Sequence, residues 1–340
     1  MPDRLDHRRK ERAMRTRMCV LTAGVLLALT ACSSGGSDAP ADSTTGSGES
    51  GAATETTEIQ MGVLPIVPSA ALQLGIDEGI FADHGFDVSL ETGQGGAALL
   101  PAVMSGQLQF AISNPLSIML AQEQGLDIRM VTGYSHSNAE GDDVTSVWAK
   151  ADSGIASPAD LAGKTVAVNT LKTMGEISIK EIVSKAGGDP DSINFVELGF
   201  PDMPAALESG NIDAAWVPEP FQTIFKDSGA NLVAYNYQET MPGVPTMSVI
   251  TAGPLAESDP DMVQEFVAAV DEVTTFAEDN PDKVRATLTT FLDMDEELAN
   301  KVLVEHFGAQ MNEDSLQALS DLSVKYGLLK EPVDMATFMP

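Results

Sequence analysis

The 340-residue sequence contains only two cysteines, Cys19 and Cys32, and both lie near its start. The rest of the chain therefore offers no disulfide, no thiol nucleophile and no cysteine ligand for a metal. Histidine is almost as scarce, with four residues at scattered positions. No metal-ligand spacing, phosphate-binding loop or Ser-His-Asp order stands out, so we expect neither a cofactor nor a metal, and no enzyme.

Basic residues are also few. Lys and Arg number 19 against 50 Asp and Glu, which gives a formal net charge of −31. Removing residues 1–31, which hold seven basic and three acidic residues, would move the net charge to −35. A body this acidic excludes nucleic acid as an expected partner, because phosphates require a basic face. Aromatic content is only 5%, which mildly favours a small anion over a flat ring as a ligand.

The sequence has no apolar run long enough for an ordinary membrane span, which needs about 20 residues. Its main apolar run, MCVLTAGVLLALTA (18–31), follows an Arg-rich segment and is typical of a signal peptide over residues 1–31. The run ends in Leu-Thr-Ala-Cys, which resembles a lipobox, so Cys32 is the predicted lipidation site. Residues 32–57 are rich in Ser, Gly and Thr, and predict a disordered tether. The expected location is the extracytoplasmic face of the cell membrane, held by a lipid anchor.

From residue 58 onward, short apolar runs alternate with helical patterns. Strands are expected at 59–64, 86–91, 108–112, 128–133, 165–169, 194–198, 212–216, 232–235 and 247–251. Helices are expected at 69–84, 95–105, 115–124, 174–186, 202–208, 220–227, 261–278, 283–292, 296–305 and 314–326. This alternation predicts an α/β fold with two mostly parallel sheets and flanking helices.

Two stretches about a hundred residues apart share one pattern. SGQLQFAISNPL (105–116) and SGNIDAAWVPEPF (209–221) each place a Ser-Gly pair before a polar residue, an aliphatic residue, a small apolar run and a proline. Each predicts a helix end followed by a strand whose carboxyl end opens into a loop. Because ligands of open α/β sheets sit outside such strand ends, the two stretches predict facing walls of one cleft.

Three segments carry a resemblance to a known family. They read GIDEGIFADHGFDVSLETGQGGAALLPAVMSGQLQFAISN (75–114), SGIASPADLAGKTVAVN (153–169) and PDMPAALESGNIDAAWVPEPF (201–221). Over about residues 58 to 300, the chain resembles the type II periplasmic binding proteins of ABC importers for nitrate, alkanesulfonate, taurine and pyrimidine precursors.

The resemblance implies two lobes that close on a ligand around a two-strand hinge. Lobe one would comprise residues 58–150 plus 246–340, and lobe two residues 151–245. The implied partners are a small-molecule ligand and a membrane permease with its ATPase, and the protein is expected to be a monomer.

The cleft loops supply candidate ligand-binding residues. Those of lobe one are Pro65, Ser69, Gly95, Gly96, Ala97, Ser113, Asn114 and His136, and those of lobe two are Thr170, Lys172, Thr173, Trp216 and Glu219. Residues 95–97 begin a helix whose free N–H groups suit an anion, although the glycines could equally serve only the turn.

Three candidates in lobe two keep two interpretations each. Trp216 is either an aromatic wall of the cleft or a core residue. Glu219 either accepts a hydrogen bond from the ligand or caps the helix that begins near Pro220, and the cap is favoured because acidic residues favour first turns. Lys172 either contacts the ligand or is a solvated loop lysine.

The leading hypothesis is therefore a solute-binding lipoprotein for a sulfonate, taurine or a nitrate-like anion. A binding protein for a pyrimidine or another aromatic heterocycle is the alternative within the same family. An enzyme on the same fold and a surface lipoprotein without a transport role are the weaker hypotheses.

Overall fold

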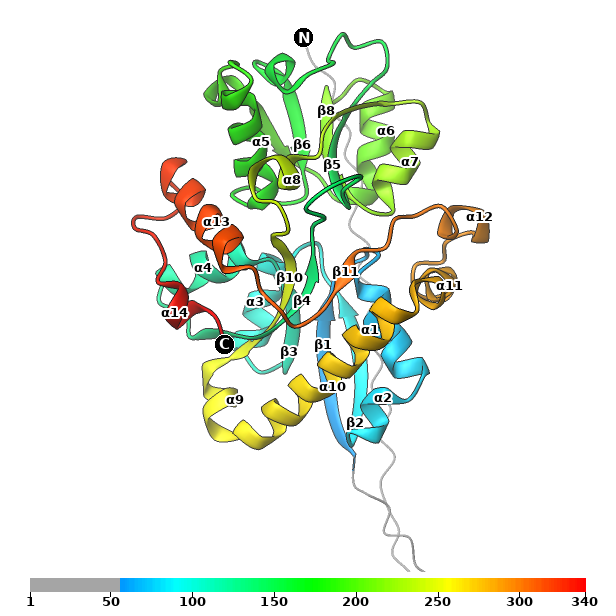
Figure 1. Ribbon diagram of the computed structural model, residues 1–340, viewed down its shortest axis with the longest axis vertical. Helices are drawn as coiled ribbons and strands as arrows, with labels where there is room; N and C mark the ends of the chain where they lie inside the picture. The colour runs from blue at the N-terminus through cyan, green and yellow to red at the C-terminus, as the bar shows by residue number, and fades with distance from the viewer. Residues whose placement is uncertain (1–55) are drawn as a thin grey trace, which may run out of the picture. The chain divides into compact units, whose positions relative to one another are not determined.

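The computed structural model describes residues 56–340, whose strands form two separate sheets (Figure 1). The larger sheet has the order β11-β4-β10-β3-β1-β2, and the smaller has the order β7-β6-β8-β5-β9. The strands of the larger sheet are β1 (Thr57–Val63), β2 (Phe86–Thr92), β3 (Phe110–Ser113), β4 (Ile128–His136), β10 (Pro245–Ala252) and β11 (His306–Phe307). Those of the smaller sheet are β5 (Thr145–Ala149), β6 (Thr165–Val168), β7 (Asn194–Glu197), β8 (Ala214–Pro218) and β9 (Asn231–Ala234).

Helices accompany each sheet, and we call each sheet with its helices a lobe (Figure 1). The large lobe carries α1 (Ser69–Asp77), α2 (Ile80–Asp83), α3 (Gly96–Met104), α4 (Pro115–Glu123), α9 (Gly253–Ser258), α10 (Pro260–Asp279), α11 (Pro281–Phe291), α12 (Glu296–Ala299), α13 (Glu313–Lys325) and α14 (Met335–Phe338). The small lobe carries α5 (Met174–Lys185), α6 (Met203–Glu208), α7 (Phe221–Asp227) and α8 (Asn236–Thr240). The predicted α/β class with two sheets and flanking helices is confirmed.

Both sheets are mixed. β1 pairs in parallel with β2 and β3, and β6 pairs in parallel with β7 and β8. β10 is antiparallel to β3 and β4, and β5 is antiparallel to β8 and β9. The cause is that the chain crosses between the sheets twice, from β4 into β5 and from β9 back into β10. β5 and β10 begin at the crossings, where the carboxyl ends of their neighbouring strands lie. They therefore run antiparallel to those neighbours.

The core of the large lobe is built on Phe266 of α10. This helix begins at Asp259, whose side chain accepts a hydrogen bond from the Met262 amide, and it buries Phe266 fully. The Phe266 ring stacks on Phe110 of β3 with 3.8 Å between ring centroids, and Phe81 and Phe86 complete the cluster at 5.7 and 5.4 Å. The cluster fixes α10 against the sheet and hence the position of the strand ends.

Two helices differ from the sequence expectation. The helix expected at 69–84 is divided at Gly79, which has a positive φ of 80°. The helix expected at 296–305 ends at Ala299, and after a turn at 300–302 the chain runs without helical structure to β11. The physical reason is a tertiary contact, because the Leu303 amide donates to Glu219 Oε1 of the small lobe at 3.0 Å instead of to a helical carbonyl.

β5 was not expected as a strand, although it is buried at all five positions. The predicted signal peptide, Cys32 and all but the last two residues of the predicted tether lie outside the described residues. Between residues 56 and 340, no helix combines the length and apolar character that a membrane crossing requires.

Candidate functional site

A cavity lies where strand ends of both sheets meet. The carboxyl ends of β1, β3, β6 and β8 reach it, together with the amino ends of β5 and β10. Its lining comprises Leu64, Ile66, Gly96, Asn114, Thr145, Asn169, Thr173, Phe200, Trp216, Pro218, Tyr237, Thr246, Met247 and Glu305. The space in it that is open to the centres of water-sized molecules is about 30 Å³, so the cavity is narrow in this conformation.

Four predicted ligand-binding residues line this cavity, namely Gly96, Asn114, Thr173 and Trp216. The two echoing sequence stretches supply Asn114 from the end of β3 and Trp216 from β8. They therefore approach one cavity from opposite lobes, as the sequence pattern predicts.

Trp216 both packs and lines the cavity. Its ring lies 5.7 Å from the rings of Phe200 and Tyr237, so three aromatic side chains form one wall. A Cβ added at Gly175 of α5 would lie 2.7 Å from the Trp216 ring, so glycine is needed there for the helix to approach. The two interpretations of Trp216 are therefore compatible.

Several buried polar atoms around the cavity lack a hydrogen-bond partner within the described chain. Trp216 Nε1 and Thr145 Oγ1 belong to lining residues, and Ser113 Oγ lies directly behind Gly96. Ser248 Oγ, opposite Ser113 in the β10–β3 pair, is also unpaired. Leaving one such group unpaired costs about 1–3 kcal/mol, so each needs a partner from outside the chain, either water or a ligand.

Glu305 is the one charged residue in the cavity lining. Its Oε2 accepts a 2.6 Å hydrogen bond from Thr246 Oγ1, which is 2.7 Å from Ser135 Oγ. Burial, helped by the negative charges of Asp143 and Glu219, raises the pKa of Glu305 to about 7, although hydrogen bonds from Thr246 and Ser135 oppose the shift. The carboxyl group is therefore poised to change its charge near neutral pH.

Sequence reasoning missed Glu305 because the expected helix at 296–305 placed it on a helical surface. A usable signal was present, since Glu305 is an acid inside the apolar stretch VLVEHF (302–307). An acid in such a stretch is buried only when it has a partner or a function.

Two predicted ligand contacts, Gly95 of the large lobe and Thr170 of the small lobe, meet beside the cavity. Gly95 lies against Asn169 and Thr170, because a Cβ added at Gly95 would be 3.0 Å from Asn169 Nδ2. Asn169 Nδ2 donates to the Gln94 carbonyl at 3.2 Å. These contacts join the two lobes directly beside the cavity.

The other predicted residues lie outside the cavity lining. Ala97 and Lys172 are exposed, and Pro65 is half-buried. Lys172 has a positive φ of 58°, and its amide donates to Glu176 Oε2 at 2.7 Å. Ser69 is fully buried at the start of α1, with an unpaired Oγ. No Lys, Arg or His of the described chain lines the cavity.

Glu219 is buried beside the crossing segments instead of in the cavity. Its Oε2 accepts from the Thr223 amide in the first turn of α7 at 3.2 Å, as the cap hypothesis expects. Its Oε1 accepts from Gln222 Nε2, Thr223 Oγ1 and the Leu303 amide at 3.0, 2.8 and 3.0 Å. Since Leu303 belongs to the large lobe, its hydrogen bond to Glu219 also joins the two lobes.

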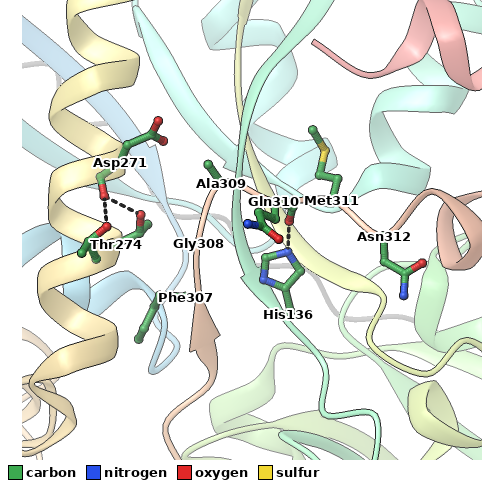
Figure 2. Close-up of a pocket in the computed structure, with 10 residues that line it drawn as sticks. His136, Asp271, Thr274, Phe307, Gly308, Ala309, Gln310, Met311 and Asn312 are labelled. Atoms are coloured by element: carbon green, nitrogen blue, oxygen red, sulfur yellow. Dashed lines mark hydrogen bonds between the residues drawn. The ribbon is translucent and has the colours of Figure 1, made fainter.

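His136 lies in a separate surface groove of about 610 Å³, between α10 and residues 307–312 (Figure 2). Its Nε2 bonds the backbone carbonyl of Gln310. Burial lowers the pKa of His136, which favours the neutral ring. The structure therefore places His136 away from the cavity that holds Trp216.

Ion pairs also cross between the lobes. Lys301 Nζ lies 2.9 Å from Asp227 Oδ2 of α7, and Lys325 Nζ lies 2.5 Å from Glu181 Oε2 of α5. Tyr326 Oη donates to the same Glu181 oxygen at 2.8 Å. Ion pairs with partly exposed partners of this kind each contribute little to stability.

Comparisons with known proteins agree with this layout. A family model described as NMT1/THI5 like matches residues 69–284. The chain is 25% identical over 271 residues to the formylaminopyrimidine-binding protein of Halalkalibacterium halodurans, covering 78% of this chain and 77% of that protein. It is 27% identical over 191 residues to the taurine-binding periplasmic protein of Escherichia coli, covering 55% of this chain and 56% of that protein.

Solved structures share the fold at lower identity. The alkanesulfonate-binding protein of Xanthomonas axonopodis, bound to MOPS, superposes with a TM-score of 0.70 at 17% identity, covering 83% of this chain and 98% of that chain. The periplasmic nitrate-binding protein of Synechocystis gives a TM-score of 0.67 at 12% identity, covering 83% and 84%. The fold is thus that of periplasmic binding proteins.

Proposed function

Because the chain belongs to the NMT1/THI5-like family, we propose that it is the extracytoplasmic solute-binding component of an ABC importer. A small solute is held between the lobes, and hinge motion at the two crossings closes the lobes around it. The observation that carries this proposal is one cavity lined from both lobes, with unpaired polar atoms at Trp216 and Thr145. Curated relatives with this role, such as the taurine-binding protein, support it.

The proposal includes the anatomy expected from the sequence. The expected boundaries, 58–150 plus 246–340 for lobe one and 151–245 for lobe two, are kept except that β5 (Thr145–Ala149) belongs to the small sheet. A lipid on Cys32 anchors the chain to the cell membrane. A permease with its ATPase receives the solute from the closed form.

The cavity lining favours a flat ring that bears N–H groups over a simple anion. Its walls are the aromatic side chains of Phe200, Trp216 and Tyr237, and its charged group is the carboxyl of Glu305. A sulfonate or nitrate would meet this acid without a lysine or arginine to balance it. We therefore place the heterocycle, the alternative within the family, ahead of the anion, and the formylaminopyrimidine-binding relative supports that order.

Binding without chemistry is the expected mode of action. The described cavity lining contains neither cysteine nor histidine. Within residues 56–340, no group of three or more His, Cys, Asp or Glu side chains is arranged to hold a metal ion. The relatives described above are named as binding proteins.

A conservative change at Trp216 tests the proposal. Trp216→Phe keeps an aromatic wall but removes the unpaired Nε1 donor, so we expect affinity for formylaminopyrimidine to fall by about five- to tenfold. The measurement is calorimetric titration, with melting temperature as the check on folding.

Trp148→Phe is the matched control, because Trp148 Nε1 already donates to Ser146 Oγ at 2.6 Å and its ring lies outside the cavity. Affinity should be unchanged in this variant. An equal loss in both variants would argue against Trp216 as a ligand wall. Absence of binding by formylaminopyrimidine, taurine, alkanesulfonates and nitrate alike would count against the proposed solute range.

A further inference from the structure

Three acidic side chains are buried near the crossings of the chain, namely Asp143, Glu219 and Glu305. The negative charges of Asp143 and Glu219 act on Glu305, and no positively charged side chain is among the described residues that shift its pKa. A buried carboxylate without a counter-charge or full hydrogen bonding is costly. Each of the three therefore needs an explanation.

The protein's own donors account for Asp143 and Glu219. Asp143 Oδ1 accepts from the Asn138 and Val144 amides, and Oδ2 accepts from Ser137 Oγ, all at 2.8 Å. Both oxygens of Glu219 are likewise occupied by donors from α7 and from the Leu303 amide. These two acids are structural acceptors.

Glu305 differs from both. Its carboxyl accepts from Thr246 Oγ1 and has the Ser135 side chain as a second hydrogen-bond partner, but no backbone amide donates to it as amides do to Asp143 and Glu219. Glu305 is also the member of the three that lines the cavity. The carboxyl group with the fewest protein donors of the three therefore lines the space that a solute would occupy.

We propose that Glu305 is a specificity-determining residue, and that its Oε1 accepts a hydrogen bond from an amino or protonated nitrogen of the bound solute. The inference rests on the proposed function and names the chemical group that the site selects. The solute nitrogen would add a donor to this carboxyl group, which receives only hydroxyl donors from the protein. An oxygen-rich, anionic edge of a solute in the same position would be repelled by Glu305 and by Asp143 and Glu219. This repulsion would exclude anionic solutes that lack the nitrogen group.

Two pairs of probes that differ in one nitrogen group test the inference. Formylaminopyrimidine is compared with its analogue lacking the ring amino group, and taurine is compared with ethanesulfonate, which lacks the ammonium group. The wild-type protein should prefer the nitrogen-bearing member of a pair by about tenfold or more, as expected for a hydrogen bond to a charged group.

Glu305→Gln should reduce that preference to about threefold or less, because the neutral amide is a weaker acceptor than a carboxylate. Glu278→Gln is the matched control. Glu278 accepts from the Phe307 amide at 2.8 Å, two residues from Glu305, but does not line the cavity. This variant should keep the wild-type preference, and melting curves would show that both variants are folded.

The outcomes separate the inference from the proposed function. Equal binding within both pairs, or a preference that survives Glu305→Gln, overturns the inference and leaves solute binding intact. Binding of ethanesulfonate or nitrate without binding of the nitrogen-bearing probes would also overturn the inference and leave solute binding intact. Failure of every probe overturns the inference, and the proposed function is then judged from solutes that copurify with the protein from its host.

Discussion

Replacing Glu219 with alanine is expected to lower the free energy of unfolding by about 3 kcal/mol or more, because several buried donors lose their acceptor at once. These donors are Gln222 Nε2, the Thr223 amide and hydroxyl, and the Leu303 amide. The side chain is only 2% exposed, so water cannot replace it without rearrangement. Chemical denaturation monitored by fluorescence measures the loss.

Asp227→Ala provides the matched control for Glu219. Asp227 also joins α7 to the large lobe, through Lys301, but both partners of that pair are nearly half exposed. Its loss should cost less than about 1 kcal/mol. Equal effects of the two substitutions would mean that Glu219 is a surface contact and not a buried junction between the lobes.

Raising the pH from 5 to 8 is expected to lower the free energy of unfolding through Glu305 by about 3 kcal/mol. Burial raises the pKa of Glu305 from 4.5 to about 7, so the folded protein binds more protons than the unfolded chain between these values. Stability is therefore highest below the unfolded pKa and falls as pH rises toward 7. Burial also raises the pKa of Asp143 and Glu219, which contribute with the same sign.

The contribution of Glu305 is isolated by comparing wild type with Glu305→Gln, because Asp143 and Glu219 are present in both. The difference in unfolding free energy between the two proteins should shift in favour of the variant as pH rises. A difference that stays constant from pH 5 to pH 8 would show that the Glu305 carboxyl is solvated in the folded protein.

Local patterns were enough to predict the fold and one part of the site. The strands β3 and β8, which bring Asn114 and Trp216 to the cavity, follow Ser-Gly pairs, and the alternation of apolar runs with helices predicted that both strand ends line one cleft. These features are encoded by neighbouring residues, so they can be recognised without the tertiary structure. The family resemblance added the order of the segments.

The remaining lining residues come from places that local patterns do not mark. Thr145 begins β5, whose buried run lacks the alternation of a half-exposed strand, and Tyr237 lies on the short helix α8. Glu305 reaches the cavity only because Glu219 holds the Leu303 amide and the chain leaves its helix at Ala299. A contact between residues 84 positions apart decides that geometry.

The most direct test of solute capture is mass spectrometry of the protein after equilibrium dialysis with formylaminopyrimidine. The proposed function predicts one solute molecule per folded chain, recovered with unchanged mass after denaturation. Less solute should be retained by Trp216→Phe and by Glu305→Gln, and the wild-type amount by Trp148→Phe. Recovery of a chemically altered product, or equal retention by all four proteins, would contradict capture of an intact solute in the cavity between the lobes.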